Sequence, residues 1–77
     1  MNAEEMFFEL GFIKNKSSCH NEEHILYENP TQFDILTIEF KNGYFVYTSC
    51  QQAPMKTDSK VLKAITQQMR ELGWLDD

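Results

Sequence analysis

Cysteine and histidine are the residue types in this 77-residue chain that could bind a soft metal ion or form a nucleophile and base pair. Cys19 and His20 are adjacent, His24 follows four residues later, and Cys50 stands alone in the second half. A structural zinc site usually draws its ligands from two close pairs, and a Cys-His nucleophile also needs an orienting group and an oxyanion hole. Neither pattern is present. A small metal- or ligand-binding domain that uses these residues stays open as an alternative.

Other chemistry-bearing residues give no catalytic or nucleic-acid pattern. Glu4 and Glu5 are neighbours in sequence, and adjacent positions on a helix do not face one another, so they are poor acid-base partners. Tyr44, Phe45 and Tyr47 could stack on RNA bases, but strand alternation divides them between two faces. We therefore expect a protein that is not an enzyme and binds no cofactor.

Composition sets the protein class. The chain has 12 acidic residues against 7 lysines and arginines, a net charge of −5, which argues against direct nucleic-acid binding. A start of Asn2-Ala3-Glu4-Glu5 with no long apolar run predicts neither a secretory signal nor a membrane span, and two cysteines fit a reduced cytoplasmic setting. Residues 1–77 are too few for two domains and too rich in aromatics for disorder, so they predict one folded domain.

The charge is distributed unevenly along the chain. Residues 1–39 carry eight acids and two lysines, whereas residues 56–70 carry Lys56, Lys60, Lys63 and Arg70 against one aspartate. Two solvated helix faces of opposite sign would explain this pattern, and so would a patch that steers a partner.

Two helix ends share one motif, because Glu9-Leu10-Gly11-Phe12-Ile13 returns as Glu71-Leu72-Gly73-Trp74-Leu75. Glycine after the last helical residue takes a left-handed conformation, and the next apolar residue folds back on the final turn. We therefore expect Phe12 to cover Phe7 and Trp74 to cover Met69.

The starts of both helices are also marked. Asn2 with Glu5 three residues later has the capping-box pattern, and Thr57 is a plausible cap for the second helix. Helical spacing of apolar residues then predicts helices over residues 3–10 and 58–72.

Between the helices the apolar period changes to two, which is typical of strands. Residues 33–40 and 44–50 flank Asn42-Gly43, a strong hairpin signal, and residues 24–28 form a shorter first strand. Residues 14–23 are expected to be a polar loop. The predicted fold is α+β, a three-stranded antiparallel meander between an N-terminal and a C-terminal helix, with both helices on one sheet face.

A two-residue turn at Asn42-Gly43 pairs Lys41 with Tyr44 and Phe40 with Phe45, and this fixes which residues share a face. If residues 29–32 turn the chain, Leu26 lies beside Ile35 and Cys50, and Glu28 lies beside Phe33. Asp34 then points toward the helices, so the strand is expected to be frayed or bulged there. The face away from the helices is mixed. It and the second helix supply the residues of a hypothetical interaction surface: Leu26, Phe33, Ile35, Tyr44, Val46, Cys50, Lys60 and Lys63.

These observations suggest a non-enzymatic protein-interaction module. A half-exposed face would tolerate scattered apolar residues, but a small domain has little core to spare and association is a common remedy. We expect a protein partner or a homodimer that forms through the open sheet face. An inhibitor whose acidic half imitates nucleic-acid phosphates is a variant within this class.

The chain also resembles the small uncharacterised accessory proteins of phages and prophages in low-GC Gram-positive bacteria. The resembling stretches are Ala3-Glu4-Glu5-Met6-Phe7, Leu10-Gly11-Phe12, Ile25-Leu26-Tyr27, Leu62-Lys63-Ala64-Ile65 and Glu71-Leu72-Gly73-Trp74. This resemblance implies a cytoplasmic protein made during infection or lysogeny, with no activity attached to particular residues.

Overall fold

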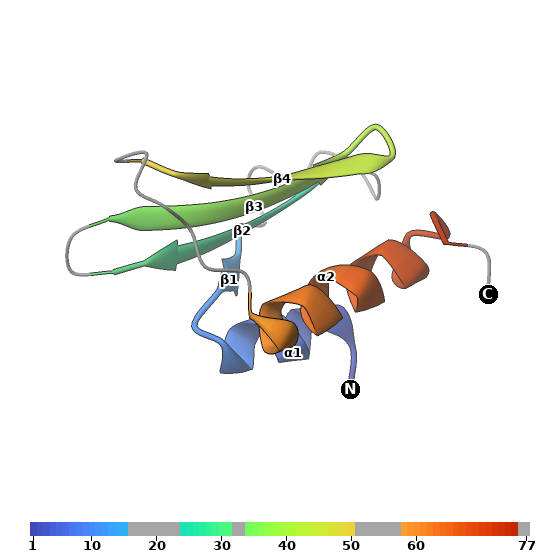
Figure 1. Ribbon diagram of the computed structural model, residues 1–77, viewed down its shortest axis with the longest axis horizontal. Helices are drawn as coiled ribbons and strands as arrows, with labels where there is room; N and C mark the ends of the chain where they lie inside the picture. Colours follow the sequence, from blue (N-terminus) through green and yellow to red (C-terminus); the bar gives the residue numbers. More distant parts are fainter. Residues whose placement is uncertain (16–23, 32–33, 51–57, 76–77) are drawn as a thin grey trace.

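A computed structural model describes residues 1–15, 24–31, 34–50 and 58–75 (Figure 1). The order of elements is α1 (Ala3–Glu9), β1 (Ile13–Lys14), β2 (Ile25–Pro30), β3 (Ile35–Lys41), β4 (Tyr44–Ser49) and α2 (Ser59–Glu71). The strands form one antiparallel sheet in the order β1-β2-β3-β4, and both helices lie against the same face of it (Figure 1). The α+β class is confirmed, with one more strand than the sequence predicted.

Both helix ends follow the predicted glycine motif. Gly11 and Gly73 have φ angles of 95° and 77°, the left-handed conformation that glycine adopts without steric cost. The amide of Phe12 donates to the carbonyl of Phe7 at 2.9 Å, and Trp74 donates to Met69 at the same distance. These are the bonds of a Schellman ending, which brings the apolar residue back onto the last turn.

The helix starts match the sequence prediction at one helix and differ at the other. Asn2 and Glu5 form a complete capping box at α1. At α2 the cap is Asp58, whose carboxylate accepts the amides of Lys60 and Val61 at 2.9 Å. The prediction of Thr57 as cap was therefore wrong, because aspartate at the next position satisfies the exposed amides and places a negative charge at the positive end of the helix.

The strand that the sequence did not predict is β1, in which Ile13 pairs with Glu28 and Lys14 pairs with Tyr27 of β2. The sequence prediction treated Lys14 as the start of a polar loop. Two residues are too few to show a period of two, and the helix stop at Gly11 directs the chain beside β2, where the pairing forms.

The β3–β4 hairpin has the predicted register, with Lys41 opposite Tyr44 and Phe40 opposite Phe45. The β2–β3 register was predicted wrongly, since Leu26 lies opposite Glu39 and not opposite Ile35. The turn is at residues 31–34, where the amide of Thr31 donates to the carbonyl of Asp34 at 2.7 Å and the Thr31 hydroxyl bonds to Asp34 twice more.

The observed register of β2 against β3 differs from the predicted one by an even number of residues, so each side chain still lies on its predicted face. Asp34 lies just before β3, where its carboxylate accepts the amide of Ile35 and the hydroxyl of Ser49. β3 therefore begins at Ile35, two residues after the start predicted from the sequence.

The hydrophobic core lies between the helices and the inner sheet face. Phe7 on α1 stacks on Tyr27 with ring centroids 4.2 Å apart, and Phe12 and Phe40 meet Phe7 edge to face. The Tyr27 hydroxyl donates to the side-chain carbonyl of buried Gln68 at 2.6 Å. Residues of the core are Ala3, Phe7, Phe12, Ile25, Tyr27, Ile38, Phe40, Val61, Ala64 and Ile65.

Candidate interaction surface

The face of the sheet that points away from the helices is called the outer sheet face here. No described helix or strand covers it (Figure 1). Its exposed apolar side chains range from 37% at Val46 to 57% at Ile13, and Leu26 is half-buried. By strand alternation its members are Ile13, Leu26, Glu28, Pro30, Ile35, Thr37, Glu39, Lys41, Tyr44, Val46 and Thr48.

Cross-strand rows on the outer sheet face alternate in character. The row through Leu26, Glu39 and Val46 has a carboxylate between two apolar side chains. The next row has Ile13 at the edge beside three polar residues, and there the hydroxyls of Thr37 and Thr48 lie 2.6 Å apart. The apolar residues are therefore distributed among polar ones and do not form one continuous patch.

A charged cluster stands at one end of the face. His24 Nε2 lies 2.7 Å from Glu39 Oε2, and Lys41 Nζ lies 3.4 Å from the other carboxylate oxygen. The hydrogen bond to His24 is the largest cause that lowers the pKa of Glu39, and Lys41 lowers it further, while partial burial acts in the opposite direction. Glu39 is therefore held ionised between two donors.

The lowered pKa of Glu39 predicts that the stability of the fold depends on pH in the acidic range. Because the pKa of Glu39 is lowered from its ordinary value of 4.5, the unfolded chain binds more protons at this carboxyl than the folded chain does. The stabilisation is complete above that ordinary value and is lost as the pH falls through the lowered pKa. In urea titrations between about pH 3 and about pH 6, Glu39→Gln should lose less stability on acidification than the wild type. Equal losses in the two proteins would contradict the assignment.

The structure brings together part of the predicted interaction surface. Leu26, Ile35, Tyr44 and Val46 share the outer sheet face, and the amide of Cys50 donates to the carbonyl of Ile35. Leu26 is nevertheless not in the row of Ile35 and Cys50, which corrects the predicted apolar row. Phe33 lies outside the described residues.

Lys60 and Lys63 lie on α2, on the other side of the sheet. They line a hollow of about 170 Å³ between the two helices together with Glu9 of α1. The basic and acidic stretches of the sequence are thus neighbours in space. Opposite charges therefore adjoin at this hollow.

In the alternative metal site, His24 and Cys50 lie too far apart to bind the same ion. His24 lies beside Glu39, whereas Cys50 pairs with Ile35, four residues away along β3. Four residues of strand span about 13 Å, far more than two ligands of one ion allow. Cys19 and His20 lie outside the described residues, and the described ranges contain no cluster of three potential ligands. Cys50 itself is an exposed free thiol.

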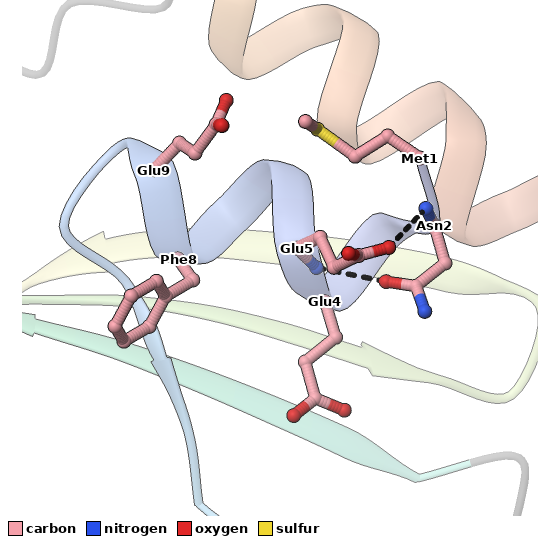
Figure 2. A pocket seen from close by; sticks show the side chains of 6 residues that line it. All are labelled: Met1, Asn2, Glu4, Glu5, Phe8 and Glu9. Carbon is pink, nitrogen blue, oxygen red and sulfur yellow. Dashed lines mark hydrogen bonds between the residues drawn. The ribbon is translucent and has the colours of Figure 1, made fainter.

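A shallow hollow of about 420 Å³ lies along α1 and is shown in Figure 2. The carboxylates of Glu4, Glu5 and Glu9 point in different directions there, and Phe8 projects away from them (Figure 2). Glu5 accepts the amide of Asn2 at 3.1 Å, so it is used in capping the helix. These groups do not converge on a common point, as ligands of one cation or a catalytic pair would.

Ile13 is the surface residue that the sequence prediction missed. It borders a hollow of about 290 Å³ that Pro30 and Ile35 also line, and Asn15 there donates to the carboxylate of Glu28. The signal was an apolar residue directly after the buried Phe12, which would alternate to the opposite face if the chain continued as a strand.

The fold and this surface define a small α+β protein in which two helices cover one face of a four-stranded antiparallel sheet. No protein-family model matches the chain, and no curated protein or solved structure shows significant similarity to it. None of the helices in the described ranges is both long and apolar enough to cross a membrane.

Proposed function

We propose that this chain is a non-enzymatic protein-interaction module that binds a protein partner through the outer sheet face. The observation that carries the proposal is the set of exposed apolar side chains on a sheet face that no described helix or strand covers: Ile13, Ile35, Tyr44 and Val46.

The mixed character of the outer sheet face supports binding that can be reversed. Non-obligate protein interfaces are only about as apolar as the rest of a protein surface, and their polar groups fix the register of the partner. Ile35 and Val46 supply apolar contact area, while Glu39 and Lys41 supply charges that a partner can match. A face with this mixture of side chains fits reversible contact with a partner better than permanent burial in an obligate interface.

The surrounding structure favours binding over catalysis. Glu39 on the outer sheet face pairs with His24 and Lys41, and these groups lie on an open surface where water is not excluded. General acid-base and nucleophilic catalysis gain most in sites that exclude water and hold convergent groups.

Capture from a cell lysate tests the proposal with the variant Ile35→Lys. Because the Ile35 side chain is exposed, the lysine should leave folding intact and replace an apolar contact with a charge. Binding of a captured protein is expected to fall by about tenfold or more, which corresponds to about 1.4 kcal/mol. The measurement is the amount of protein recovered on immobilised wild type and variant at equal loading.

Leu62→Lys is the matched control. Leu62 is 53% exposed on α2, so the substitution adds the same charge on the other side of the sheet. It should recover the same proteins as the wild type. Equal recovery on the Ile35→Lys protein, or no recovery above bare resin with the wild type, would contradict binding through the outer sheet face.

A further inference from the structure

The edge strand β4 has backbone groups that point away from the sheet. The amide of Cys50 donates to the carbonyl of Ile35 at 3.2 Å, which makes these two residues a hydrogen-bonded pair of the antiparallel ladder. Such pairs alternate with non-hydrogen-bonded ones, so the backbone groups of Tyr44, Val46 and Thr48 face β3. The N–H and C=O groups of Phe45 and Tyr47 therefore point outward, and no described strand pairs with them.

β4 also lacks the features that usually prevent pairing at a sheet edge. Its six residues, Tyr44–Ser49, include no charged residue, proline or glycine. Natural edges are protected by short strands, lysines, prolines or bulges. The opposite edge has two of these, because β1 is only two residues long and one of them is Lys14. The two edges of the sheet thus differ, and β4 is the one suited to accept another strand.

We propose that β4 pairs antiparallel with β4 of a second copy of this chain, about a two-fold axis at Val46. In this register Phe45 of each copy exchanges both backbone hydrogen bonds with Tyr47 of the other, so the outward N–H and C=O groups of these two residues are used in both strands. Val46 faces Val46 of the second copy as a non-hydrogen-bonded pair. Phe45 and Tyr47 point to the same face of the sheet, so pairing them keeps the helix side of one copy on the helix side of the other. The helices of both copies then lie on one side of a single continuous sheet.

The carboxylates of two copies stay far apart when the copies meet at this edge. Two copies each carry a net charge of −5, and approach is opposed wherever carboxylates meet. The nearest carboxylate in the row of Val46 is Glu39 on β3. In the paired sheet the two Glu39 residues are three strand spacings apart, about 14 Å, which exceeds the screening length of about 8 Å at physiological salt.

The side chains complete the self-complementary contact. On the helix side Phe45, which already contacts Phe40 at 6.0 Å between ring centroids, meets Tyr47 of the second copy. On the outer sheet face the exposed Val46 side chains cover each other. This pairing uses the edge of β4 and the Val46 side chain, whereas Ile13 and Ile35 of the outer sheet face take no part in it.

Amide hydrogen exchange of the full chain at two protein concentrations tests the pairing. Between about 10 μM and about 1 mM, protection of the Phe45 and Tyr47 amides should rise by about tenfold or more, while the Val46 and Thr48 amides are protected at both concentrations by the β3 ladder. Sedimentation measured in parallel should show the mass rising from one chain toward two.

The variant Val46→Lys gives an independent readout, because it brings two ammonium groups together at the axis of the dimer. The side chain at position 46 is exposed in the single chain, so the substitution should not disturb its folding. It should shift dimer formation to at least about tenfold higher concentration. Ile35→Lys, the same charge on β3, should dimerise as the wild type does.

A wild type that is monomeric at about 1 mM would overturn the proposal. So would a dimer in which the Phe45 and Tyr47 amides exchange as fast as in the single chain, since that result would mean contact through the sheet face. Loss of lysate capture by Ile35→Lys with dimerisation intact bears only on the outer sheet face, so the two proposals fail separately.

Discussion

Replacing Phe7 by alanine is expected to lower the free energy of unfolding by about 3 to 5 kcal/mol, the usual range for a fully buried phenylalanine. Phe7 is completely buried and its ring contacts residues of three other segments: Tyr27 of β2, Phe40 of β3 and Phe12 after α1. The cavity would therefore lie where the first helix, which is seven residues long, meets the sheet.

A loss of this size is large for so small a protein. Domains are stable by about 5 to 15 kcal/mol in total, and the smallest lie near the lower limit. The Phe7→Ala protein should be partly unfolded at room temperature. The measurement is chemical denaturation followed by circular dichroism, with the shift of the midpoint multiplied by the slope.

Phe8→Ala is the matched control, since it removes the same ring from the next position of the same helix. Phe8 is 69% exposed, so its loss should change stability by less than about 0.5 kcal/mol. Similar destabilisation by both substitutions would mean that the helix, and not the burial of Phe7, determines the result.

Removing the Tyr27 hydroxyl with Tyr27→Phe is expected to cost about 1 to 3 kcal/mol. The hydroxyl donates to Gln68 Oε1 at 2.6 Å inside the core, and Gln68 is the buried polar residue of the described chain, only 4% exposed. Without the donor, the carbonyl oxygen of Gln68 is left buried with an unmet hydrogen bond, which is the costly part of the change.

A double-mutant cycle with Gln68→Met separates this cost from the loss of packing. Methionine has a similar shape and no polar oxygen, so the double variant should recover part of the stability lost in Tyr27→Phe. The measurement is denaturation of all four proteins under the same conditions. If the two single losses simply add, the hydroxyl and the amide are not coupled and the buried hydrogen bond does not contribute as described.

Local elements of this fold were predictable because short-range physics determines them. Gly11 and Gly73 end their helices by adopting a backbone conformation that other residues avoid, and Asn42-Gly43 requires the tight turn that sets the β3–β4 register. In each case the residues that carry the signal are within six positions of one another, so no distant contact had to be known.

The candidate surface was predicted only in part, for the same reason. The face of each strand residue follows from alternation, so Leu26, Ile35, Tyr44 and Val46 were correctly assigned to one face. Their neighbours across strands depend on the turn between β2 and β3. Two candidate turns of equal length, 29–32 and 31–34, differ by two positions, and the hydrogen bonds between Thr31 and Asp34 select the second.

The sequence by itself determined the class of fold, the ends of both helices and which side chains point toward the helices. Only the tertiary structure decided that Glu39 separates Leu26 from Val46, that Ile13 joins the sheet, and that His24 and Cys50 lie too far apart to share a metal ion. The physical reason is that alternation repeats every two residues, so it fixes a side of the sheet but not a position along it. That position depends on hydrogen bonds and packing between segments distant in the chain, and it determines which groups meet on the outer sheet face.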